Sequence, residues 1–123
     1  MALQCNMCDS MNTFVLKQDK YRKVRGGHSR FLNIMCASCD TKLFLYQKDG
    51  PGPLKRAYLD RIHAPEKLVG LEKIKPIEAI ANIVCKKCKI TIGMSYVYAK
   101  ERRGAFLLRP GFFLKKLTKG VWE

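Results

Sequence analysis

Acidic residues are scarce in this chain, and no group of residues in it resembles a catalytic set. The 123 residues include only 10 Asp and Glu against 24 Lys and Arg, which gives a formal net charge of +14. With so few carboxylates, paired acids for general acid–base catalysis do not stand out. No Ser, His and Asp arrangement that would activate a nucleophile stands out either. We therefore expect a protein that is not an enzyme.

Long apolar runs are also lacking. The apolar stretches are only a handful of residues long, too short for a membrane-spanning helix, so no membrane partner is expected. The opening Met-Ala-Leu-Gln-Cys lacks the basic flank and apolar run of a signal peptide. These features predict a cytoplasmic protein in a reducing, intracellular environment.

No cysteine stands outside a pair. The six cysteines form three Cys-x-x-Cys motifs, which are Cys5/Cys8, Cys36/Cys39 and Cys85/Cys88. Each motif, which we call a knuckle, lets two thiolates converge on one ion, and two knuckles complete the closed tetrahedral site of structural Zn²⁺. In a reducing compartment such pairs indicate metal ligation rather than disulfides. The predicted cofactor is Zn²⁺, and a saturated four-cysteine site leaves no position for a catalytic water.

The chain contains an internal repeat. Residues 31–36 and 81–85 both end in the first cysteine of a knuckle and both carry Asn three positions before it. Residues 57–61 resemble residues 105–109 at a similar distance beyond the knuckle. The pattern predicts a duplicated unit of strand, knuckle, strand, loop and strand.

β-prone residues dominate the rest of the sequence. Turn signals rich in Gly and Pro occur at 49–53 and 110–111, and Pro76 begins a predicted helical turn. The expected strands include residues 13–16, 43–46, 90–92, 95–98, 106–108 and 112–114. The predicted fold class is mostly β.

Spacing alone leaves open which knuckles share a metal ion. Cys36 and Cys39 with Cys85 and Cys88 would join two facing hairpins across residues 40–84, and the repeat favours this choice. Cys5 and Cys8 with the second knuckle would instead enclose residues 9–35, giving an N-terminal zinc ribbon followed by a C-terminal β extension. In the first case the Cys5/Cys8 pair is left over, either without metal or at a second ion.

Several of these residues resemble the pattern of the Yippee zinc-binding proteins. The resemblance covers about residues 31–115 and consists of the second and third knuckles, Leu43, the 52–59 segment and Ile92-Gly93-x-x-Tyr96. Residues 50–62 are also similar to a run in small microbial zinc proteins. Yippee proteins belong to the β-tent group, with the ligand-binding domain of cereblon and the RNA-binding C-terminal domain of antiviral RNA-sensing helicases.

The resemblance implies two roughly orthogonal antiparallel sheets joined by one zinc ion. It assigns the zinc to the second and third knuckles, in a β-tent-like domain over residues 31–123. Residues 1–30 would then form a separate N-terminal hairpin with the first knuckle and a basic loop. The chain departs from the family in having Met94 where a Trp is usual.

The charge and pI of about 9.8 favour a phosphate polymer as partner. Two cation-rich segments, residues 17–30 and 48–56, contain glycines that let a backbone approach phosphate closely. Tyr21, in the first segment, could stack on a base. We expect nucleic acid, RNA ahead of DNA, to contact Lys17, Lys20, Tyr21, Arg22, Lys23, Arg25, Arg30, Lys48, Lys55 and Arg56. A solvated loop and a tight turn remain the alternatives for these segments.

Two other functions remain open at this point. One is an adaptor that binds a protein or a small ligand through an aromatic surface at Tyr96, Tyr98 and Phe106. The other is a redox or methionine-repair enzyme, which would need a reactive thiolate at Cys5 or Cys8, because no cysteine follows Cys88.

Overall fold

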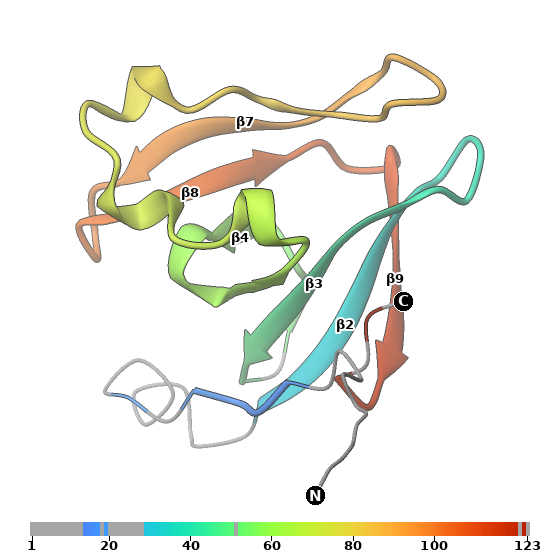
Figure 1. Cartoon of the computed structure of the whole chain (residues 1–123), viewed down its shortest axis with the longest axis horizontal. Helices are drawn as coiled ribbons and strands as arrows, with labels where there is room; N and C mark the ends of the chain where they lie inside the picture. The colour runs from blue at the N-terminus through green and yellow to red at the C-terminus, as the bar shows by residue number, and fades with distance from the viewer. Residues whose placement is uncertain (1–13, 18, 20–28, 51, 121, 123) are drawn as a thin grey trace, which may run out of the picture.

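Two antiparallel four-stranded sheets make up most of the described structure. The computed structural model describes residues 14–17, 19, 29–50, 52–120 and 122. The first sheet has the order β5-β3-β2-β9, with bounds Ile62–Ala64, Lys42–Asp49, Ser29–Cys36 and Phe113–Thr118. The second has the order β4-β8-β7-β6, with bounds Arg56–Tyr58, Arg103–Leu108, Thr91–Tyr98 and Ile83–Val84. Figure 1 shows β7 and β8 running across the direction of β2 and β3. The mostly β, β-tent-like architecture is therefore confirmed.

The first sheet is covered on both faces. In β2, Leu32 and Ile34 point into the main core between the sheets, while Phe31 points to the opposite face. This is the alternation of a strand with two apolar faces. The opposite face is covered by Phe14, Leu16 and Trp122, which lie against the cluster formed by Phe31, Leu45 and Ala64.

The second sheet contributes the other half of the main core. Ile92 and Phe106 are fully buried, and Leu108 is nearly so. Their apolar contact with β2 and β3 is the main source of adhesion between the sheets, since burial of such side chains is worth about 1.5–3 kcal/mol each. Phe106 therefore belongs to the core, and it cannot form the exposed aromatic surface that the adaptor hypothesis requires.

The third strands of the two repeats, β4 and β8, lie side by side in the second sheet. β4, from the first repeat, leaves the first sheet and pairs antiparallel with its counterpart β8 in the second. Ala57 opposes Phe106 and Tyr58 opposes Ala105, which is the reciprocal pairing of two equivalent segments about a local twofold axis. β5 takes the place beside β3 that β4 would otherwise occupy. Hydrogen bonds between β4 and β8 thus join the two repeats independently of any metal ion.

Residues 65–82 connect the sheets through short 3₁₀ turns. These turns follow β5 and are η2 (Glu66–Leu68), η3 (Leu71–Lys73) and η4 (Ile77–Ala79). A further turn, η1 (Leu59–Arg61), lies between β4 and β5. Pro76 precedes η4, so the helical turn expected there is present. Within the described ranges no helix is long and apolar enough to cross a membrane.

The expected N-terminal hairpin cannot be compared with the structure. Residues 1–13 and 20–28, which contain the first knuckle and most of the basic loop, lie outside the described residues. Residues 14–17 are not strand, although Phe14 N–H donates to the carbonyl of Gly120 at 2.8 Å. The backbone N–H of Lys17 donates to Gln47 Oε1 at 2.7 Å, and Gln47 Nε2 donates to the carbonyl of Lys17 at 2.8 Å.

A buried polar cluster lies at the end of β3. Arg61 is fully buried, and its Nε donates to Asp49 Oδ2 at 2.6 Å. Its Nη1 and Nη2 atoms donate to the carboxylate of Asp19. Asp49 also accepts hydrogen bonds from Ser29 Oγ at 2.6 Å and from the Gln47 amide at 3.0 Å. Asp19 and Ser29, on either side of residues 20–28 in the sequence, are thus both attached to the buried pair of Arg61 and Asp49.

His63 makes the stability of this region depend on pH. Burial, together with the charges of Lys17 and Arg61, lowers its pKa to about 4, below the usual value of 6.5. Between these values the unfolded chain binds a proton that the folded chain excludes, so stability falls as the pH is lowered from about 6.5 towards 4. The full difference between the two pKa values corresponds to roughly 3.4 kcal/mol. Because the ring is only partly buried, solvent screening reduces the expected contribution to roughly 2 kcal/mol.

We expect His63→Gln to remove this dependence, and His28→Gln serves as the control at the other histidine. Urea midpoints measured at neutral pH and near pH 4.5 should fall less for His63→Gln than for the control chain. Metal release at low pH affects both variants, so it cancels in the comparison. Equal slopes for the two variants would show that His63 does not titrate in this way.

Candidate metal centre and basic pocket

The second and third knuckles share one backbone geometry. In the second knuckle, Cys36 N–H donates to the carbonyl of Thr41 at 2.9 Å, and Asp40 N–H donates to the carbonyl of Cys36 at 2.8 Å. The third knuckle has the same two bonds, 2.9 and 2.8 Å long, among Cys85, Ile90 and Lys89. The fourth residue after each first cysteine has a positive φ, 61° and 64° respectively. The repeat in the sequence is therefore a repeat in three dimensions.

The two knuckles bring four sulfur atoms together. Cys36, Cys39, Cys85 and Cys88 have all their Sγ atoms within 4.8 Å of one another. The Sγ atoms of Cys36 and Cys88 are 3.9 Å apart, and those of Cys39 and Cys85 are 3.5 Å apart. A tetrahedral ion with metal–sulfur bonds of about 2.3 Å requires sulfur atoms about 3.8 Å apart. The four cysteines could therefore hold one metal ion, as predicted for this pairing.

The surroundings of the sulfurs favour thiolates. A hydrogen bond with Thr41, whose Oγ1 lies 3.0 Å from the Cys39 sulfur, lowers the pKa of Cys39 to about 6. The backbone N–H of Cys88, 3.4 Å from the Cys85 sulfur, lowers the pKa of Cys85. In contrast, its proximity to Cys39 raises the pKa of Cys88 to about 12. A divalent cation would relieve this conflict, because it stabilises all four thiolates at once.

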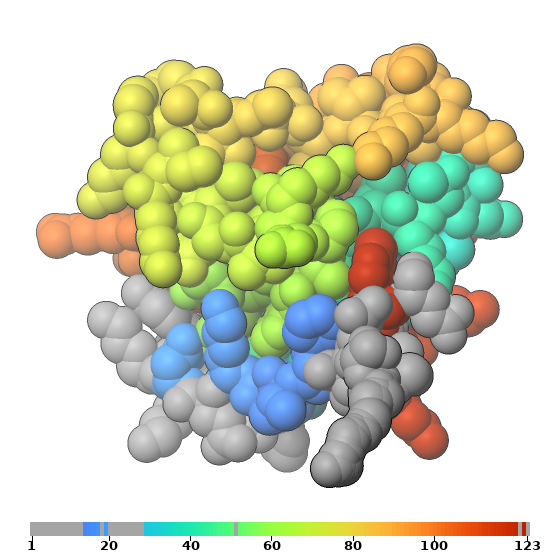
Figure 2. Space-filling view, viewed as in Figure 1, coloured from blue at the N-terminus to red at the C-terminus, as the bar shows by residue number. Residues whose placement is uncertain are grey.

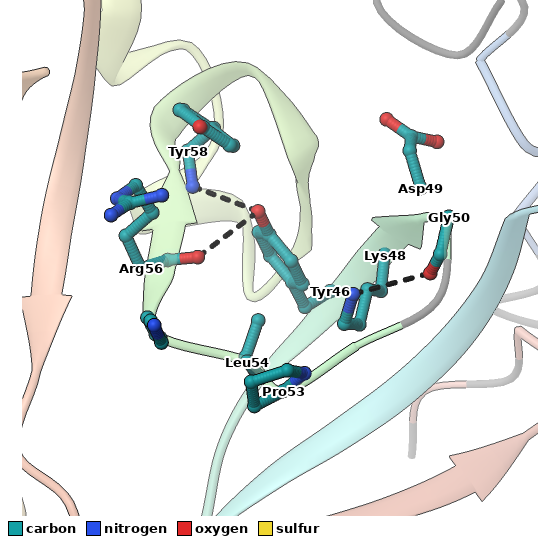
Figure 3. Close-up of a pocket in the computed structure, with 9 residues that line it drawn as sticks. Tyr46, Lys48, Asp49, Gly50, Pro53, Leu54, Arg56 and Tyr58 are labelled. Carbon is teal, nitrogen blue, oxygen red and sulfur yellow. Dashed lines mark hydrogen bonds between the residues drawn. The ribbon is translucent and has the colours of Figure 1, made fainter. Parts of the chain in front are cut away.

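The two ends of β3 carry two different features. The strand begins beside the metal centre, at Lys42, and ends at Asp49 beside a polar cavity, so about 20–25 Å of strand separates them. The cavity has a volume of about 280 Å³ and is lined by residues of the segments 46–50 and 53–58. Figure 3 shows this cavity, which we call the basic pocket.

Three cationic side chains line the basic pocket. Lys48 and Arg56 come from β3 and β4, and Lys55 comes from the segment between them, where it is exposed. Lys48 Nζ donates to the carbonyl of Gly50 at 3.2 Å, and Arg30 Nη1 reaches the same carbonyl at 3.1 Å. Four of the predicted nucleic-acid contacts therefore gather at this pocket.

Tyr46 forms a buried wall of the pocket. Its hydroxyl accepts a hydrogen bond from Tyr58 N–H at 2.9 Å and lies 3.5 Å from the carbonyl of Arg56 (Figure 3). Burial raises the pKa of Tyr46, so its hydroxyl stays protonated. Tyr46 therefore ties β3 to the strand that crosses into the second sheet. The sequence predicts Tyr46 only as part of a strand, because a tyrosine in a β-prone run gives no signal that its hydroxyl bonds to another strand.

Arg56 is held in a defined orientation. Its Nε donates to the hydroxyl of Tyr96 at 2.9 Å, and its guanidinium lies 4.0 Å from the ring centroid of Tyr98. Two of the three aromatics named for the adaptor hypothesis thus support a cation of the pocket. Glycines at 50 and 52 have φ of 78° and 102°, so the turn between the strands uses a conformation that favours glycine.

The remaining predicted contacts divide into two groups. Lys17 lies elsewhere, with its Nζ hydrogen bonded to the carbonyl of Asp60. Outside the described residues lie Lys20, Tyr21, Arg22, Lys23 and Arg25, together with the predicted metal ligands Cys5 and Cys8. The only acidic side chain that lines the basic pocket within the described residues is Asp49, and Arg61 pairs with it.

No protein-family model, no curated protein and no solved structure matches this chain in the comparisons.

Proposed function

We propose that this protein is a non-catalytic zinc-binding module that binds nucleic acid, RNA in preference to DNA, through the basic pocket. The observation that carries the proposal is the gathering of Arg30, Lys48, Lys55 and Arg56 around one turn. Phosphate groups are attracted to such a cluster, and counterions released from the nucleic acid add to the affinity. The metal ion, for which zinc is proposed because of the four-thiolate donor set, has a structural role.

The geometry supports contact with a phosphate backbone more than readout of bases. Arg56 is oriented by Tyr96 and Tyr98, so its planar guanidinium is ready for a charge-assisted contact with phosphate. Lys55 is exposed and lacks an oriented contact of this kind among the described residues, so it would act as a point charge. We infer that binding has a strong electrostatic component and a weak sequence preference.

Salt dependence tests this proposal. If four cations each neutralise one phosphate of a single strand, affinity should fall roughly 50-fold between about 50 and 200 mM salt. Fluorescence anisotropy with a short labelled single-stranded RNA, and with DNA of the same sequence, measures both this slope and the RNA preference. Affinity that does not change with salt would contradict the proposal.

Charge reversal identifies the site. Lys55→Glu should weaken RNA binding by about tenfold or more and should lower the salt slope by about one. Lys73→Glu is the matched control, because Lys73 is also exposed and does not line the basic pocket. Both substitutions change the net charge equally, so equal effects would show that the total charge, and not the basic pocket, attracts the RNA.

A further inference from the structure

A second cavity lies between the metal centre and the 3₁₀ turns. It has a volume of about 810 Å³ and is bounded by η2, η3, the β6 segment and the start of β3. Leu68, Leu71 and Ile80 contribute apolar walls that continue into the main core. Ile74 and Val84 also line it while remaining 41% and 44% exposed. Figure 2 shows the yellow-green and yellow surface that residues 60–82 form on this side of the molecule.

The rim of this cavity is positively charged. Lys42, Lys67 and Lys86 line it, and among the described residues Glu66 is the one acidic residue that does so. Lys67 and Lys86 come from different segments and line the same cavity, so both cations border the space that a ligand would fill. An anionic group bound here would be attracted to both of them. We call this cavity the lysine-rimmed groove.

The groove also contains an open strand edge. In the described part of the second sheet β6 is the last strand and pairs with β7 alone. Residues 82–84, which include β6, line the groove, so this last strand of the sheet borders it. Along this segment Ile83 is buried and Val84 is exposed, the alternation of a strand. An extended peptide can add to such an edge, with backbone hydrogen bonds for affinity and side-chain pockets for specificity.

We propose that the lysine-rimmed groove binds an extended peptide segment of a partner protein in which apolar residues alternate with acidic ones. The peptide adds a strand beside β6, its apolar side chains contact Leu68, Leu71 and Val84, and its carboxylates meet Lys67 and Lys86. This function goes beyond nucleic-acid binding, because the basic pocket lies at the other end of β3. A phosphate backbone offers neither apolar side chains for the walls nor a strand for the edge.

Selection from a random octapeptide library displayed on phage, against the full-length zinc-loaded protein, tests the proposal. Enriched peptides should alternate apolar residues with Asp or Glu. A synthetic enriched peptide should bind about tenfold or more weakly to Lys67→Glu and to Val84→Lys. Val69→Lys is the matched control, because Val69 is 46% exposed and does not line the groove. Methylation of one alternate set of peptide nitrogens should abolish binding and methylation of the other set should not, because only every second N–H of an added strand faces β6.

Three results would overturn the proposal. These are no enrichment, enrichment of peptides without acidic residues, and equal affinity for Val84→Lys and Val69→Lys. A wild-type dimer that Val84→Lys dissociates would show instead that the groove binds a second copy of the chain. RNA affinity should be the same in Val84→Lys as in the wild type, which separates this proposal from the function proposed for the basic pocket.

Discussion

Cys85→Ser is expected to abolish metal binding at the four-cysteine site and to lower the melting temperature by roughly 20 °C or more. Cys85 is completely buried, and its sulfur lies 3.5 Å from that of Cys39 across the junction of the two knuckles. Loss of one thiolate leaves three ligands, with Cys88 alone from the third knuckle, so an ion that connects the hairpins would be held much more weakly. Thermal unfolding followed by circular dichroism, with metal content determined on the same samples, measures both effects.

The control for this substitution lies in the same knuckle. Lys87 is exposed, and Lys87→Ala leaves the backbone of the turn in place, so its melting temperature and metal content should stay close to those of the wild type. Removal of the ion from the wild type with a strong chelator should reproduce the behaviour of Cys85→Ser. A chelated wild type that melts as before would show that the apolar core and the β4–β8 pairing stabilise the fold without metal.

Arg61→Met is the second substitution with a large expected effect. Arg61 is fully buried between Asp49 and Asp19, and Met has a similar length without the charge. Asp49 would then keep a buried carboxylate without its counterion, which costs about 3–5 kcal/mol of folding free energy. Urea unfolding of the zinc-loaded protein at neutral pH measures the loss.

A second substitution separates the roles of the two carboxylates. The side chain of Asp19 is 41% exposed, so Asp19→Asn should cost only about 1 kcal/mol or less. Arg61→Met combined with Asp49→Leu should regain part of the stability that Arg61→Met alone loses, because no buried charge remains. If Arg61→Met unfolds within about 1 kcal/mol of the wild type, the ion pair does not stabilise this end of β3.

Much of the metal centre could be predicted from local sequence. A Cys-x-x-Cys turn needs only the residues around it, so the two knuckles that share a geometry also share a sequence pattern, including the Asn before each first cysteine. Repetition of that pattern favoured the pairing of Cys36 and Cys39 with Cys85 and Cys88, and the sulfur positions agree. The choice of zinc as the ion remains a proposal.

The contacts between distant segments could not be predicted in this way. Asp49 looked like part of a polar turn, yet it is buried because Arg61 and Ser29 approach it from other elements. The pairing of β4 with β8 in the second sheet, and not with β3, depends on competition between β4 and β5 for the edge of β3. Neither outcome leaves a signal in hydrophobic alternation, because a strand has the same pattern whichever neighbour it pairs with.

The basic pocket could be predicted from the sequence only in part. The glycine-rich turn and its cations could be found in the sequence, whereas their meeting with Arg30 depends on the pairing of β2 with β3. Support of Arg56 by Tyr96 depends on the second sheet. The cations of the turn could therefore be found from local sequence. Strand pairing in the structure explains why Arg30 lies with Lys48, Lys55 and Arg56.

Whether one zinc ion joins the second and third knuckles is tested most directly by the zinc content of two double variants, measured by native mass spectrometry. We expect Cys5→Ser with Cys8→Ser to retain one tightly bound zinc ion per chain, coordinated by four sulfur atoms in X-ray absorption. Cys36→Ser with Cys39→Ser should lose that ion. Loss of the zinc from the first variant and retention in the second would contradict the assignment.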